Sequence, residues 1–230
     1  MKYIFCMHIA PATAVEAATQ KLRDDIVAGV LPPEARLRLR DLTVRFGFGA
    51  TPLREALSRL AAEGFVVFEG QKGFSVPPVT RVHLLDITRS RQFVEPEALR
   101  QAMGEGGAAW EDEIVTSLSL LKREVERRTD GEAWLDIYEA KHHRFHRALI
   151  AACPLVSLRA FCDELYMQTT RYRRLMKSAT PDWPRLAAAH DALAECVLAR
   201  DEAAATEALR RHIGTTATKV LEMLGEAPPS

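Results

Sequence analysis

The spacing of apolar residues in the first third of the chain predicts three short helices. Apolar side chains recur there every three or four residues, which is the period of an amphipathic α-helix, and glycine or proline ends each stretch. Thr51 followed by Pro52 is typical of a helix start, with the threonine hydroxyl as the cap and the proline at the first helical position. The three predicted helices cover residues 14–29, 40–46 and 51–64.

Two short runs of aromatic and β-branched residues follow these helices. Residues 65–68 and 73–76 flank a turn that contains Gly70, and this pattern predicts a β-hairpin. Three helices followed by a hairpin is the order of a winged helix-turn-helix domain, which we place at residues 13–78. Two consecutive prolines, Pro77 and Pro78, end this domain.

The remainder of the chain has a helical pattern. None of it alternates between apolar and polar residues as a half-buried strand would. We therefore predict a mainly α protein in which an all-helical bundle, residues 79–226, follows the winged helix. Trp110, Trp134, Cys153 and Cys162 are assigned to the core of this bundle. Its predicted helices cover residues 82–104, 110–128, 132–151, 155–177, 184–199 and 202–224.

Composition narrows the class of protein. The chain has 230 residues, with 31 lysines and arginines against 31 aspartates and glutamates, which excludes a long basic tail. No apolar run approaches the roughly 20 residues that span a bilayer, so we expect no membrane partner. The four cysteines form no close pair of the kind that builds zinc or redox sites, which favours a cytoplasmic protein with reduced thiols. Residues 1–12 are expected to be a poorly ordered leader rather than a signal peptide, with Met7 as an alternative start.

Positive charge is concentrated in the predicted winged helix. Residues 36–59 contain six arginines and only two acidic residues, Asp41 and Glu55. Such a surface suits DNA phosphates, and Arg54 lies in the first turn of the helix that would enter the major groove. Gln71 and Lys72 at the hairpin tip are further candidate donors. A solvated basic face, or a winged helix that binds protein, would show the same charge.

Three segments of this region resemble the GntR family of bacterial transcription regulators. They are LRLRDL at residues 37–42, ATPLREALSRL at residues 50–60 and EGFV at residues 63–66, and the resemblance covers nearly all of residues 14–80. It implies a homodimer in which each winged helix reads one half of a palindromic double-stranded DNA operator. By position, the DNA contacts that it implies are Arg40, Thr51, Arg54, Gln71, Lys72 and Gly73.

The chain departs from the common family pattern immediately before this core motif. Gly49 and Ala50 stand where Ser-Arg is usual, so one base-reading arginine is missing. The operator of typical members therefore cannot be transferred to this chain. The Gly-Ala version occurs in the CsiR-like branch of the family.

Histidines in the helical domain are candidate metal ligands. His142 and His146 are four residues apart on a predicted helix, so both rings lie on one face and can bind one divalent ion. His143 points about 100° away from them. His190 and His212 belong to two later helices, and a bundle can bring both to the first pair. Histidines that merely pack in the core or lie on the surface are the alternative.

Residues 81–224 resemble the FCD effector domain of the FadR branch of the GntR family. The resemblance rests on Arg91-x-x-x-Glu95, on HHRFHRAL at residues 142–149, and on His190 and His212. Many such domains hold one divalent metal with an aspartate, a histidine four residues later and two further histidines. His142 stands at the aspartate position here. The resemblance therefore implies a metal held by His142, His146, His190 and His212, and imidazole donors favour zinc or nickel.

Arginines of the helical domain are candidate anchors for an acidic ligand. Arg91, Arg171 and Arg173 lie on predicted helices, and a buried arginine requires an acidic partner. The resemblance implies that the position of Arg91 holds an effector acid, so the implied ligand is a small organic acid or dicarboxylate. A solvated helix face is the alternative for residues 171–174.

Three functional hypotheses follow from these observations. The first is a ligand-responsive transcription regulator, by analogy a repressor that its effector releases, which dimerises through the helical domain. The second is a metal-dependent hydrolase on the helical bundle, although no glutamate or aspartate beside the histidines forms a recognisable general-base motif. The third is a winged-helix adaptor that binds protein. We favour the first hypothesis and therefore expect no enzymatic activity.

Overall fold

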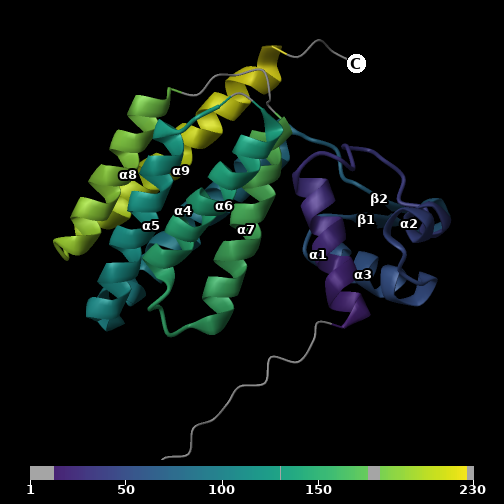
Figure 1. The fold of residues 1–230 in the computed structure, drawn as a ribbon, viewed down its shortest axis with the longest axis horizontal. Coiled ribbons are helices and arrows are strands. Elements are labelled where there is room, and N and C mark those ends of the chain that lie inside the picture. The colour runs from purple at the N-terminus through teal and green to yellow at the C-terminus, as the bar shows by residue number, and fades with distance from the viewer. Residues whose placement is uncertain (1–12, 130, 176–181, 227–230) are drawn as a thin grey trace, which may run out of the picture. The chain divides into compact units, whose positions relative to one another are not determined.

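The computed structural model describes residues 13–129, 131–175 and 182–226 (Figure 1). The chain divides into two compact units, residues 1–78 and residues 79–230. The leader predicted at residues 1–12 and its alternative start Met7 lie outside the described residues.

The first unit contains three helices and a hairpin. Thr13 and Glu16 form a capping box at the start of the first helix, in which each side chain bonds the other residue's backbone amide. The strands pair antiparallel with Val67 opposite Ser75, and the core includes the fully buried Leu53 and Leu57. This order confirms the predicted winged helix-turn-helix. The elements are α1 (Ala14–Val27), α2 (Leu39–Phe46), α3 (Ala50–Ala62), β1 (Val67–Glu69), a 3-10 turn (Gly70–Lys72) and β2 (Gly73–Ser75).

The predicted start of the third helix is wrong. α3 begins before Thr51, and its N-cap is Gly49, which has no side chain to bond the free amides of the first turn. Thr51 therefore lies inside the first turn and does not act as the cap. Pro52 is tolerated there because first-turn amides have no helical acceptor to lose.

The first strand of the hairpin is also shifted from its predicted position. It begins at Val67 instead of Phe65. Phe65 and Val66 are buried, and their amides donate to the carbonyl of Leu60 at the end of α3. These two residues therefore fasten the end of the helix to the core, and the strand starts only after them.

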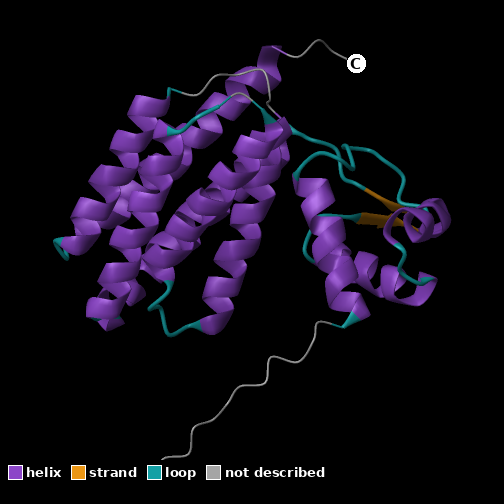
Figure 2. Ribbon diagram, in the orientation of Figure 1, coloured by secondary structure: helices purple, strands orange, loops and turns teal. Residues whose placement is uncertain are grey.

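The second unit is a helical bundle, and its described residues contain no strand (Figure 2). α4 packs against α7 and α9, while α5 packs against α6 and α8. No helix among the described residues is long and apolar enough to cross a bilayer. The helices are α4 (Arg81–Glu105), α5 (Ala108–Glu126), α6 (Glu132–Ile150), α7 (Val156–Leu175), α8 (Trp183–Leu198) and α9 (Glu202–Glu226).

The aromatic and thiol residues assigned to the bundle core are buried there, as predicted. The indole N–H groups of Trp110 and Trp134 donate to backbone carbonyls, at 2.8 and 3.2 Å respectively. Cys153 and Cys162 are buried free thiols, and burial raises the pKa of Cys162 to about 12. Cys162 therefore stays protonated, and both cysteines serve packing.

Candidate metal centre and nucleic-acid interface

Four histidines from three helices meet in the core of the second unit. His142 and His146 lie one turn apart on α6, while His190 comes from α8 and His212 from α9. All four are buried, and their donor nitrogens lie within 4.8 Å of one another. His142 Nε2 is 3.0 Å from His190 Nε2 and 3.2 Å from His146 Nε2. The fold thus brings together every residue that was predicted to bind metal.

The spacing of these nitrogens suits one divalent cation. Zinc–nitrogen bonds of about 2.0–2.1 Å place the donors of a tetrahedral site roughly 3.3 Å apart, close to the observed 3.0 and 3.2 Å. Imidazole is a good ligand for zinc and nickel, whereas magnesium and calcium prefer oxygen. The residues present therefore fit a metal ion held by neutral nitrogen donors.

The other ring nitrogen of His142 is held from outside the cluster. Its Nδ1 lies 2.6 Å from the hydroxyl of Tyr166 on α7. Tyr166 is buried, and burial raises its pKa, so it stays a neutral phenol. A metal-binding histidine commonly has such a partner, because the contact fixes the tautomer and the orientation of the ring. Tyr166 therefore holds His142 with Nε2 toward the centre of the cluster.

Burial keeps the four rings uncharged at neutral pH. It lowers the pKa of His142, His146 and His212 well below the ordinary value and that of His190 to about 4. The positive charge of Arg173 adds to this lowering at His190, because it opposes a second positive charge nearby. Neutral rings offer the free lone pairs that metal coordination requires.

Two of the arginines predicted to bind an effector are each paired with a glutamate. Arg91 and Glu95 form a buried pair on α4, with Nε to Oε1 at 2.5 Å and Nη2 to Oε2 at 3.2 Å. Arg173 donates to both carboxylate oxygens of Glu139 on α6, at 3.2 and 2.7 Å. Both guanidiniums lie over the ring of Tyr166, 5.2 and 5.1 Å from its centre. Each pair is neutral overall, so these residues do not offset the charge of a bound cation.

Two other residues of this region face elsewhere. Arg171 follows Tyr166 by five residues, which places it about 140° around α7 from Tyr166. The burial of His83 is the main cause that lowers the pKa of this histidine, and the positive charge of Arg171 lowers it further. Arg171 therefore lies on a different side of α7 from Tyr166, and its role as an effector contact stays a prediction. His143 points away from the cluster as predicted, with Nε2 2.5 Å from Oδ1 of Asp163.

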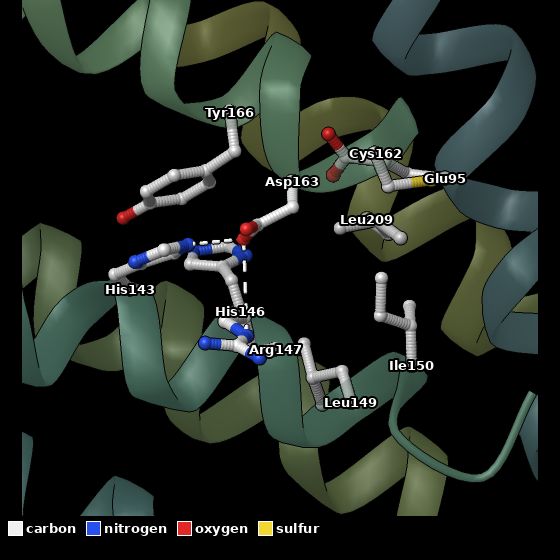
Figure 3. A pocket seen from close by; sticks show the side chains of 10 residues that line it. All are labelled: Glu95, His143, His146, Arg147, Leu149, Ile150, Cys162, Asp163, Tyr166 and Leu209. Carbon is white, nitrogen blue, oxygen red and sulfur yellow. Dashed lines mark hydrogen bonds and ion pairs between the residues drawn. The ribbon is translucent and has the colours of Figure 1, made fainter. Parts of the chain in front are cut away.

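A small cavity opens beside the cluster (Figure 3). Its volume is about 20 Å³, which is room for roughly one water molecule. His146, Glu95 and Tyr166 line it, and Figure 3 shows Asp163 joined by dashed lines to His143 and Arg147. An organic acid is larger than this space, so it can enter only when side chains or helices move.

In the first unit, the residues predicted to contact DNA lie on α2, α3 and the hairpin. All are exposed except Gly73, which is half-buried at the start of β2. Arg54 on α3 and Lys72 at the hairpin tip line one groove together with Arg36 and Arg38, which belong to the predicted basic surface of residues 36–59. The predicted set is Arg40, Thr51, Arg54, Gln71, Lys72 and Gly73.

Comparison with known proteins identifies the family. Residues 14–76 match the bacterial regulatory proteins of the gntR family, and residues 86–215 match the FCD domain. The chain belongs to the GntR family. It is 38% identical over 209 residues to the HTH-type transcriptional regulator BphR of Paraburkholderia xenovorans, covering 90% of this chain and 84% of BphR. It is 35% identical over 198 residues to the HTH-type transcriptional repressor GlaR of Escherichia coli, covering 84% of this chain and 90% of GlaR.

Solved structures share the fold of this GntR-family chain. McbR/YncC of E. coli superposes with a TM-score of 0.79 over 93% of this chain and all of its own, at 20% identity. A putative GntR regulator from Rhodococcus sp. RHA1 gives a TM-score of 0.72 over 92% of this chain and 99% of its own, at 18% identity. The fold, a winged helix followed by a helical bundle, is therefore common to all three.

These matches decide between the three functional hypotheses. The families and relatives are transcriptional regulators and not enzymes, so the hydrolase hypothesis is set aside. The winged helix belongs to a DNA-binding family, so the hypothesis of a protein-binding adaptor is also set aside. The predicted GntR and FCD assignment is confirmed, and a CsiR-like branch is consistent with it.

Proposed function

We propose that this GntR-family regulator is a ligand-responsive repressor whose FCD domain binds a divalent metal ion and a small carboxylate effector. The observation that carries the proposal is the buried cluster of four histidines, with donor nitrogens within 4.8 Å of one another. GlaR, to which the chain is similar, is named a repressor, which supports repression. The protein has one state with high affinity for DNA and one with low affinity, and the effector acts by binding these two states with different affinities.

The donor set favours zinc or nickel as the metal. Its four protein ligands are all imidazoles, His142, His146, His190 and His212, where many FCD domains have an aspartate in the first position. The exchange removes a negative charge and an oxygen donor, and both are features that manganese and magnesium prefer. When bound, the metal would supply a Lewis-acidic centre that can hold a carboxylate oxygen as a fifth ligand beside the four imidazoles.

Charge is the reason to expect an anionic effector. Four neutral imidazoles leave the double positive charge of a metal ion uncompensated in a buried site, and an uncompensated buried charge costs several kcal/mol. A carboxylate that coordinates the metal offsets this charge. Arg91 and Arg173 each have guanidinium N–H groups beyond those that bond Glu95 and Glu139. These remaining donors can hold the second acidic group of a dicarboxylate.

The winged helix supplies the DNA contacts of the repressor. We assign Thr51 and Arg54 to the major groove, because they lie in the first turns of α3. Arg40 contacts the phosphate backbone at the start of α2. Gln71, Lys72 and Gly73 form the wing tip that contacts the neighbouring groove. The operator is palindromic double-stranded DNA, and because the target is chromosomal, the protein is placed in the cytoplasm.

A palindromic operator calls for a homodimer, and α4 offers a self-complementary face for it. Val82 and Phe93 are 79% and 83% exposed, and Asp86 and Arg89 lie between them on the same side of the helix. In an antiparallel pair of α4 helices related by a twofold axis, Val82 meets the partner's Phe93 and Asp86 meets the partner's Arg89. Apolar side chains then meet apolar side chains, and opposite charges meet each other, which supports a dimer through the FCD domain.

A thermal-shift panel tests the metal and the effector together. Chelator-treated protein is melted alone, with zinc or nickel, and with metal plus each of a set of small mono- and dicarboxylates. A ligand at 100 times its Kd adds about 2.7 kcal/mol, which is roughly 5–11 °C for a protein of this size. Carboxylate stabilisation that needs metal supports the proposal. Absence of any stabilisation by metal overturns the metal site, and stabilisation by metal but by no carboxylate overturns the effector class.

A further inference from the structure

The four histidines of the cluster are at most 8% exposed, so a metal ion needs a path from solvent to reach them. The small cavity of Figure 3 touches both the cluster and the surface. Its inner wall includes His146 together with the buried Glu95 and Tyr166. Its outer wall includes Asp163 and Arg147, which are 38% and 68% exposed as side chains. The cavity therefore lies between the histidine cluster and solvent.

A contact between two helices closes the outer wall of this cavity. The carboxylate of Asp163 on α7 accepts a hydrogen bond from Nε2 of His143 on α6 at 2.5 Å, and Arg147 Nε lies 3.8 Å from the same carboxylate oxygen. The ring of His143 is also held by stacking on Tyr166, with 4.6 Å between the ring centres and 13° between the planes. We call the contact of His143 with Asp163 the latch.

The cavity behind the closed latch is too small for an ion to pass through. Its volume of about 20 Å³ holds roughly one water molecule, and a zinc ion that carries even part of its water shell is larger. The ion can therefore pass only when His143 and Asp163 separate. Both side chains are partly exposed, at 23% and 38%, and side chains at the surface change rotamer without any unfolding of their helices.

We propose that the latch of His143 and Asp163 is a gate that sets the rate at which metal ions enter and leave the histidine cluster. The inference rests on the metal site proposed above. It gives a function to His143, which is turned away from the cluster and is not one of the proposed ligands. The latch is closed whether or not an ion is bound, so it raises only the barrier between the two states. It therefore slows binding and release by the same factor and leaves the Kd for the metal unchanged.

The kinetics of zinc exchange with the full chain test the gate. Release is followed in a stopped-flow instrument by mixing zinc-loaded protein with a saturating coloured chelator, and uptake by mixing chelator-treated protein with zinc, both at one constant pH. A hydrogen bond to a charged group has a net strength of about 1.4 kcal/mol, which corresponds to tenfold in rate. Asp163→Ala should therefore take up and release zinc roughly tenfold faster than the wild type, with the same Kd.

Two further variants separate the gate from a general loosening of the bundle. Asp163→Asn keeps the shape of the side chain and a weaker, neutral hydrogen bond, so its rates should lie between those of the wild type and Asp163→Ala. Asp136→Ala breaks another ion pair between α6 and α7, in which Asp136 lies 2.5 Å from Arg174. Neither residue of that pair lines the cavity, so wild-type rates are expected. Unchanged melting curves of the chelator-treated variants show that the fold is intact.

The outcomes distinguish this inference from the function on which it rests. No uptake of zinc by the wild type refutes the metal site itself. Uptake by the wild type with the same rates in Asp163→Ala refutes the gate alone. Faster release without faster uptake in Asp163→Ala also refutes the gate, because the Kd then rises and Asp163 stabilises the bound ion. Faster exchange in Asp136→Ala refutes it as well, since any loosening between α6 and α7 would then have the same effect.

Discussion

Removing the negative charge of Glu139 tests the charge balance around the histidine cluster. Glu139 and Arg173 are 7% and 16% exposed as side chains, and the guanidinium also donates to Thr170 Oγ1 at 2.9 Å. Glu139→Gln keeps the shape of the side chain but leaves a buried positive charge without its counter-ion. Breaking a buried ion pair from one side costs about 3–5 kcal/mol. At about 2–4 °C for each kcal/mol in a protein of this size, the melting temperature should fall by roughly 6–20 °C.

An exposed pair in the same bundle is the matched control. Arg144 and Glu113 form the same bidentate geometry, at 2.8 and 3.0 Å, but both side chains are exposed, at 47% and 40%. Glu113→Gln should cost less than about 1 kcal/mol, because water screens an exposed pair. The double variant Glu139→Gln/Arg173→Met should recover much of the loss, since it removes both buried charges together.

The assay is thermal unfolding of chelator-treated protein, followed by circular dichroism at constant pH and salt. Equal small shifts for Glu139→Gln and Glu113→Gln would refute the reasoning, because Arg173 would then be solvated. A metal ion bound in this region would then need no anionic ligand. A large loss that the double variant does not recover would place the effect in packing and not in charge.

Three further predictions concern the second unit. The pKa of His190 in the folded protein, about 4, lies below its ordinary value, so the unfolded metal-free chain takes up the proton first as the pH falls. Between pH 7 and 5.5, this residue should therefore remove about 1.2 kcal/mol from the free energy of unfolding. In urea titrations, the free energy of unfolding of His190→Asn should decline over this pH range by that much less than the free energy of the wild type. His146→Ala should abolish the thermal stabilisation by zinc, whereas His143→Ala, which lies outside the cluster, should keep it; equal behaviour of the two would refute the ligand assignment. Phe93→Asp should yield monomers in sedimentation, whereas Val115→Asp, at a 52% exposed position of α5, should remain a dimer. A dimeric Phe93→Asp variant would exclude the α4 face as the dimer interface.

The sequence alone was sufficient for the elements and for the family. Helical periodicity is a local property, so the order of helices and hairpin could be predicted from apolar spacing. The core motif at residues 50–60 identified the winged helix, because its apolar positions pack in the core of the first unit and its sequence is typical of the family. His142 and His146 could be placed on one face since both belong to a single helix.

Local detail was less predictable where tertiary contacts compete with propensity. Thr51 has the hydroxyl of a good helix cap, yet α3 begins at Ala50 and leaves the cap to Gly49. Phe65 and Val66 have the composition of a strand, but their burial beside the end of α3 places them before the hairpin. For Phe65 and Val66, packing outweighed a strand preference of about 1 kcal/mol.

Only the tertiary structure decided how the site is assembled. The approach of His190 and His212 to α6 depends on how α8 and α9 pack, and helical spacing does not carry that information across loops. The sequence treated Arg171 and Arg173 alike, although residues two positions apart on a helix point about 200° apart, and the fold pairs Arg173 with Glu139 and Tyr166. The roles of Tyr166 and Glu139 had no sequence signal of their own, because a neutral phenol and a paired carboxylate gain their function only from the ring and the guanidinium that the fold places beside them.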